Sequence, residues 1–111
     1  MSLLFSEVFP SNYLKASDLN GRRKSLIIHK VLMEEIGEDG TKKPVIEFDN
    51  TDKRLVLNKT NGSVIAEAYG DEMDKWTGKP IELFPSKVQF SGRLVDAIRV
   101  SIPDFDVDVP L

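Results

Sequence analysis

The sequence predicts a mainly β protein in which five strands form a small barrel and one helix lies between the third and the fourth strand. Stretches rich in β-branched and apolar residues alternate with turn signals through residues 22–103, and one helical pattern interrupts them. The strands are expected at 24–36, 44–50, 53–58, 80–88 and 94–102, and the helix at about 60–69. This order is that of an OB-fold, a five-stranded Greek-key barrel that often binds oligonucleotides or oligosaccharides.

The first two expected strands form a hairpin. The first strand is the longest and is rich in β-branched and apolar residues from Ser25 to Met33. A glycine-rich, charged loop at 37–43 leads into the second strand. There Phe48 alternates with Glu47 and Asp49, which is typical of a residue that faces a core.

Start and stop signals bound the helix. Thr60 or Asn61 can cap its N-terminus by accepting backbone N–H hydrogen bonds, and Gly70 can close its C-terminus. Its apolar stripe consists of Val64, Ile65, Ala68 and Tyr69. Trp76 follows, and it either plugs the base of the barrel or offers a stacking platform for a base. Its position at the helix-to-strand junction favours the plug.

Length and composition indicate one domain of three parts. Residues 1–21 are expected to form an arm that packs on the barrel or on a neighbouring subunit, 22–103 the barrel, and 104–111 an acidic and hydrophobic tail. The chain has no secretory signal and no apolar run near the roughly 20 residues that cross a bilayer, so no membrane partner is expected. There are no cysteines, which suits a reducing cytoplasm.

Charge neither requires nor excludes a nucleic-acid partner. The net charge is −3, but three aspartates lie in the last eight residues. Without Asp104, Asp106 and Asp108, acidic and basic residues are equal at 15 each. A neutral body can still carry a local basic stripe.

The residues do not indicate an enzyme. His29 is the only histidine and has no partner histidine for a metal site. The acidic run at 71–74 does not match a calcium loop. No phosphate-binding glycine loop, nucleophile elbow or acid–base pair is present, so the sequence predicts no catalytic residue, metal or cofactor.

Basic and aromatic residues near the expected strand ends predict a site for single-stranded DNA, which needs cations for phosphates and rings for bases. The predicted phosphate contacts are Lys42, Lys43, Arg54, Lys59 and Arg93. Phe48 and Phe90 are the candidate stacking rings. The alternative is an ordinary solvated surface. The site requires Arg54 and Arg93 to lie on the same side of the barrel.

The C-terminal tail alternates acidic and apolar residues to its end. It resembles the acidic tip of bacterial single-stranded-DNA-binding proteins, which end in aspartates, a proline and a large apolar residue and recruit replication and repair enzymes. Asp108, Pro110 and Leu111 match best and are the expected partner-binding residues. The alternative is an edge strand that turns Phe105, Val107 and Val109 inward.

Four segments resemble a family of small phage and prophage proteins. They are 13–19, 56–61, 76–81 and 95–100, with sequences YLKASDL, VLNKTN, WTGKPI and VDAIRV. The resemblance implies a phage or prophage origin and a bacterial host cytoplasm, often beside recombination and replication functions. It carries over no ligand-binding residues.

These observations predict an accessory protein of phage DNA metabolism that binds single-stranded DNA weakly and without sequence preference. The alternative is a non-catalytic protein-interaction module that docks through the arm and the tail. A sugar-binding domain is a distant third, because only one tryptophan is available. The sequence leaves open the oligomeric state, the identity of a replication or recombination partner, and the choice between DNA and RNA.

Overall fold

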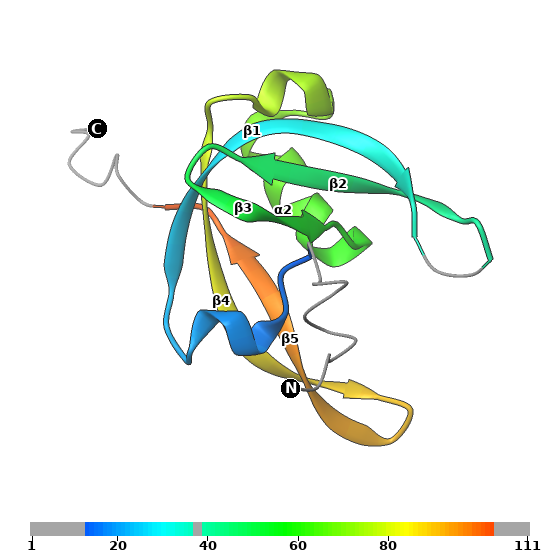
Figure 1. The fold of residues 1–111 in the computed structure, drawn as a ribbon. Helices are drawn as coiled ribbons and strands as arrows, with labels where there is room; N and C mark the ends of the chain where they lie inside the picture. The colour runs from blue at the N-terminus through cyan, green and yellow to red at the C-terminus, as the bar shows by residue number, and fades with distance from the viewer. Residues whose placement is uncertain (1–12, 37–38, 104–111) are drawn as a thin grey trace, which may run out of the picture.

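The computed structural model describes residues 13–36 and 39–103, and it confirms the predicted mainly β fold. Its elements in chain order are the 3-10 helix η1 (Ala16–Leu19), the strands β1 (Lys24–Glu35), β2 (Lys42–Phe48) and β3 (Thr51–Val56), the helix α2 (Lys59–Tyr69), the 3-10 helix η2 (Met73–Trp76), and the strands β4 (Pro80–Phe90) and β5 (Arg93–Ser101). Figure 1 shows α2 lodged between β3 and β4 in the chain and packed at one end of the curled sheet.

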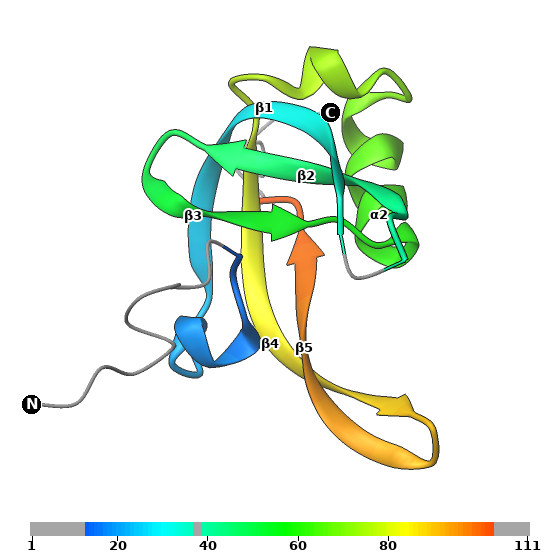
Figure 2. The same cartoon turned by 45° about the vertical axis from the view of Figure 1, so that its right-hand side comes forward.

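The five strands form one antiparallel sheet in the order β3-β2-β1-β4-β5. β1 connects its two halves, because Lys24–Ile27 pair with β4 while Ile28–Glu35 pair with β2. A register shift between Ile28 and Lys30 marks the change of partner. A β-bulge of this kind bends a strand and increases its twist. The sheet therefore curls into the half-barrel seen in Figures 1 and 2, with β3 and β5 as its edges.

Residues before β1 pack on the chain's own half-barrel. The Leu14 N–H donates to the Arg54 carbonyl at 2.8 Å, and Tyr13 forms a parallel bridge with Arg54. η1 then packs against β4 and β5, where Leu19 is buried. The part of the predicted arm that the structure describes thus lies between the two edge strands. Residues 1–12 lie outside the described range.

The helix begins at Lys59, one residue before the start that the sequence predicts. Asn58 is its N-cap, and its side-chain oxygen accepts the Asn61 N–H at 2.8 Å. The predicted caps Thr60 and Asn61 both lie inside the helix. Asn61 is instead buried, with 2% of its surface exposed, and its amide binds the edge of β5. It donates to the Ile98 carbonyl at 2.9 Å and accepts the Val100 N–H at 3.2 Å.

Trp76 plugs the base of the half-barrel, as its position in the sequence suggested. Only 2% of its surface is exposed, and its indole N–H donates to the Gly70 carbonyl at 2.9 Å. It packs in a single core cluster with apolar residues of every strand, which are Leu26, Ile28, Ile46, Phe48, Leu55, Ile81, Leu83, Ile98 and Val100. A stacking role for Trp76 is therefore ruled out in this fold.

Lys42 and Lys43 belong to β2 rather than to the loop predicted at 37–43. They continue the hairpin ladder opposite Glu35 and Glu34. Opposite charges paired across antiparallel strands stabilise the ladder by a few tenths of a kcal/mol to about 1 kcal/mol. This local pairing extends the hairpin beyond the barrel, as Figure 1 shows for β1 and β2.

Candidate nucleic-acid interface

The predicted site residues do not form one cluster. Lys42 and Lys43 are exposed on the β1–β2 hairpin, and Lys59 is the first residue of α2. Phe90 and Arg93 face each other across the turn of the β4–β5 hairpin. Figures 1 and 2 show that the two hairpins end at different places on the barrel. Only the Phe90–Arg93 pair brings a predicted ring and a predicted cation together.

Phe48 cannot serve as the predicted stacking ring. It is a member of the core cluster, and only 7% of its surface is exposed. The alternation of Phe48 with Glu47 and Asp49 gives the physical reason, because successive strand residues face opposite sides of a sheet. The ring therefore stabilises the core and offers no face to a base.

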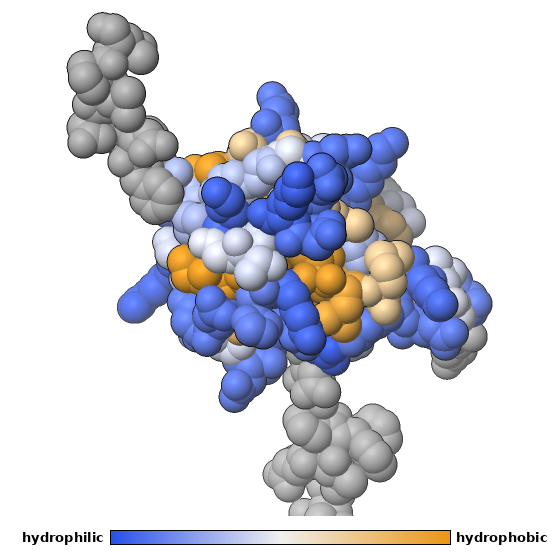
Figure 3. All heavy atoms as spheres, turned by 90° about the horizontal axis from the view of Figure 1, so that it is seen from above, coloured by the Kyte–Doolittle hydropathy of each residue, from blue (hydrophilic) through white to orange (hydrophobic). Residues whose placement is uncertain are grey.

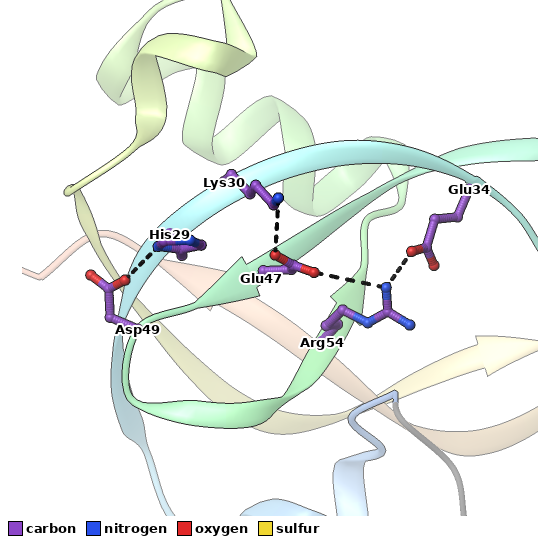
Figure 4. Close-up of polar contacts among 6 residues, drawn as sticks. All are labelled: His29, Lys30, Glu34, Glu47, Asp49 and Arg54. Atoms are coloured by element: carbon purple, nitrogen blue, oxygen red, sulfur yellow. Dashed lines mark hydrogen bonds and ion pairs between the residues drawn. The ribbon is translucent and has the colours of Figure 1, made fainter.

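Arg54 is part of an ion-pair network on the outer side of β1, β2 and β3, drawn in Figure 4. Its guanidinium pairs with Glu34 and lies 4.0 Å from the Glu47 carboxylate. Lys30 reaches the same Glu47 at 3.8 Å. The Arg54 side chain is only 22% exposed. Carboxylates thus already neutralise the cation that was predicted to bind phosphate on this side.

Tyr13 attaches the N-terminal segment to this network. Its hydroxyl donates to Glu34 at 2.8 Å, and its ring lies under the Arg54 guanidinium at 5.2 Å. The hydrogen bond to Glu34, with desolvation and the negative charge of Glu34, raises the pKa of Tyr13. Arg54 therefore holds the N-terminal segment against the sheet, which is a structural role.

A second surface, on the outer side of β4 and β5, combines arginines with phenylalanines. Residues paired across antiparallel strands share a face, and the register pairs Phe84 with Arg99 and Phe90 with Arg93. The opposite, inner face carries the buried pair Leu83 and Val100. Arg23, next to the start of β1, lies over the Phe84 ring at 4.3 Å. We define the arginine–phenylalanine face as Arg23, Phe84, Phe90, Arg93 and Arg99.

Few negative charges oppose this face. Among the described residues of β4 and β5 that share its side of the sheet, Glu82 is the only acidic one. Glu82 accepts a hydrogen bond from Arg23 at 3.2 Å, and Ser101 lies within 3.3 Å of both. The other basic residue of the hairpin, Lys87, is on the opposite face and pairs with Asp96 at 2.6 Å. The face is therefore net positive.

The hairpin tip offers an open aromatic surface. Phe90 is 69% exposed, which makes it the most exposed large apolar residue of the described chain. A ring held open beside an arginine is a common platform for an unpaired base, worth about 1–3 kcal/mol per stacked base. Phe84 differs, because the Arg23 guanidinium covers one side of its ring. The face thus provides one open ring and one ring already stacked by a cation.

Arg23, Phe84 and Arg99 were missed in the sequence-based prediction of the site. A two-residue period along β4 would have indicated that Phe84 and Phe90 share a face. The residues on that face are Phe84, Ser86, Val88 and Phe90, and the residues between them are buried or polar. The same period runs through Arg93, Val95, Ala97 and Arg99 on β5. The period identifies a face but not its partners, since Arg23 comes from a distant part of the chain.

The described residues contain neither a metal cluster nor a membrane-spanning helix. Within residues 13–36 and 39–103, no group of three or more His, Asp or Glu side chains is arranged to hold a metal ion. No helix in this range is long and apolar enough to span a membrane. Seen from above, hydrophobic side chains gather in the middle of a largely hydrophilic surface (Figure 3). The expected partner-binding residues Asp108, Pro110 and Leu111 lie outside the described residues.

No family model, curated protein or solved structure matches the chain. The residues and their geometry are therefore the basis for the function proposed below.

Proposed function

We propose that the chain binds single-stranded DNA weakly and without sequence preference, and that the arginine–phenylalanine face makes the contacts. The observation that carries this proposal is the pairing of each phenylalanine with an arginine on one net-positive side of β4 and β5. Arginines attract phosphates, while a phenyl ring stacks on any base. A role in phage DNA metabolism belongs to the same proposal and rests on the resemblance of four segments noted in the sequence.

The proposed site keeps two of the predicted residues and replaces the others. Phe90 and Arg93 remain, with Arg23, Phe84 and Arg99 in place of Phe48 and Arg54. Lys42, Lys43 and Lys59 lie on other elements and have no proposed part in binding. The weak affinity follows from the small number of contacts, since three arginines and one open ring provide the recognition.

Substitutions at the hairpin tip test this proposal. Phe90→Ala removes the open ring and should weaken binding of a labelled oligo-dT about tenfold, as expected for loss of one stacked base. Arg93→Ala should weaken it severalfold and reduce its salt dependence. Both residues are exposed, so neither substitution should alter folding. Fluorescence anisotropy measures the affinities, and circular dichroism verifies the fold.

Lys87→Ala is the matched control, because it removes a charge from the same strand but from the opposite face. Its affinity should stay within about twofold of the wild type, since an exposed ion pair contributes little. Equal losses in Lys87→Ala and Arg93→Ala would contradict the assignment to this face. Unchanged affinity in Phe90→Ala would remove the stacking role.

A further inference from the structure

A hollow beside the start of β1 is lined with three basic residues, and the proposed site uses only one of them, Arg23. It encloses about 430 Å³ between η1 and β1. Its lining residues are Asp18, Leu19, Asn20, Arg22, Arg23 and Lys24. We call it the basic hollow. Three of its six lining residues are consecutive cations, which is the longest run of basic residues in the described chain.

The only carboxylate of the basic hollow is already engaged. Asp18 accepts the Lys15 backbone N–H at 2.8 Å and pairs with the Lys53 ammonium at 3.2 Å. These contacts lower the pKa of Asp18, chiefly through the backbone hydrogen bond. Its negative charge is therefore directed to Lys15 and Lys53 rather than to Arg22 and Lys24. The hollow remains able to attract an anion.

The basic hollow adjoins the arginine–phenylalanine face through one shared residue. Arg23 lines the hollow, and its guanidinium also lies over the Phe84 ring at 4.3 Å. Lys24 pairs with Leu83, so it lies on the inner side of the sheet, and the hollow meets the arginine–phenylalanine face only at Arg23. An anionic chain that contacts Arg99 and Phe84 therefore turns past Arg23 to reach the hollow, and Glu82 is the acidic residue beside that path.

We propose that a bound single strand runs from the basic hollow along β4 to the hairpin tip, with Arg22 and Lys24 as further phosphate contacts. This inference rests on the proposed function and extends it to a continuous track. From Leu83 to Phe90 the strand spans seven residue steps, or about 23 Å. That length corresponds to about seven nucleotides of a stacked strand at about 3.4 Å each. It lies within the range of about 4–16 nucleotides that OB-folds bind.

A length series of oligo-dT, from about two to about twelve nucleotides, tests the track. For the wild-type chain, affinity should rise steeply up to about seven nucleotides and only slowly beyond. The double variant Arg22→Ala/Lys24→Ala should bind the longest oligonucleotide about tenfold more weakly. The slope of the logarithm of its association constant against the logarithm of salt concentration should be less steep by about 1.4. Each phosphate contact on a single strand contributes about 0.7 to that slope. Arg22→Gln/Lys24→Gln replaces it if the alanine variant does not fold.

Lys42→Ala/Lys43→Ala is the control, since it removes two exposed lysines from a different hairpin. It should bind every length as the wild type does. The track is wrong if the two double variants lose affinity equally, or if Arg22→Ala/Lys24→Ala binds the longest oligonucleotide normally while Phe90→Ala does not. If the wild-type chain fails to bind even a 30-mer (about twice a typical site), the proposed function itself fails.

Discussion

At the scale of single residues, Asn61 shows how one side chain replaces a missing strand. In a closed barrel the edge of β5 would find a strand partner, but here the sheet order leaves β5 at an edge. The Asn61 amide donates to the Ile98 carbonyl and accepts the Val100 N–H, as a neighbouring backbone would. Among the described residues it is the only buried polar one, and both ends of its amide are satisfied.

Asn61→Ala should destabilise the fold by about 2–4 kcal/mol, because it leaves two buried backbone groups without their partner and opens a small gap. Urea unfolding followed by circular dichroism measures the change. Ser63→Ala, an exposed change on the same helix, is the control and should shift stability by less than about 0.5 kcal/mol. A loss of equal size in both variants would contradict the role of the amide, because alanine favours the helix at both positions.

Arg54 illustrates the difference between a basic residue and a binding residue. Arg54→Ala removes the ion pairs with Glu34 and Glu47 and uncovers the Tyr13 ring, so it should cost about 1–2 kcal/mol of stability. Its affinity for oligo-dT should stay within about twofold of the wild type. A loss of affinity as large as that of Arg93→Ala would return the site to the side of β1, β2 and β3.

At the scale of elements, the Asp18 carboxylate connects η1 to the edge strand β3. This group accepts the Lys15 N–H at the start of η1 and reaches across to Lys53 of β3. It thereby connects η1, which packs on β4 and β5, to the opposite edge strand. The ion pair with Lys53 requires the charged form of the carboxyl group, and the backbone hydrogen bond is stronger with it.

The acid stability of the fold should depend on Asp18. Its pKa in the folded chain is lowered from 3.8, so its contribution is present above 3.8 and is lost as the pH falls through the folded value. Asp18→Asn should therefore be less stable than the wild type at neutral pH, and the two urea midpoints should converge as the pH falls below 3.8. A constant difference between the midpoints at all pH values would contradict this.

The elements themselves were largely predictable from the sequence, because their signals are local. β-branched runs, turn residues and the apolar stripe of α2 predicted the order of the strands along the chain and the position of the helix among them. The helix cap was missed because Asn58 and Asn61 are both good capping residues, and only the fold decides that Asn61 binds β5. Lys42 and Lys43 were predicted to lie in a loop. Their place in β2 depends on their pairing with residues of the preceding strand, which no local pattern indicates.

At the scale of the whole molecule, the curl of the sheet decides which charges meet. Arg54 meets Glu34 and Arg23 meets Phe84 through contacts between residues far apart in the chain. No local pattern indicates which cation a carboxylate will neutralise. The sequence therefore pointed to basic and aromatic residues, but it could not predict that those on one side of the barrel are engaged in ion pairs while the other side is net positive.

The resulting picture is a half-barrel with two unlike outer surfaces. The side formed by β1, β2 and β3 is occupied by its own ion pairs and by the N-terminal segment. The side formed by β4 and β5 keeps arginines beside phenyl rings, with one acidic residue among those the structure describes there. Binding to single-stranded DNA is the central claim that this asymmetry supports.

The salt dependence of oligo-dT binding tests that claim most directly. A labelled oligonucleotide of about 30 nucleotides is titrated with the wild-type chain at several salt concentrations. Three arginine contacts predict that the logarithm of the association constant falls with the logarithm of salt concentration with a slope of about −2 or steeper. Absence of binding at low salt, or an affinity that does not change with salt, would contradict the account.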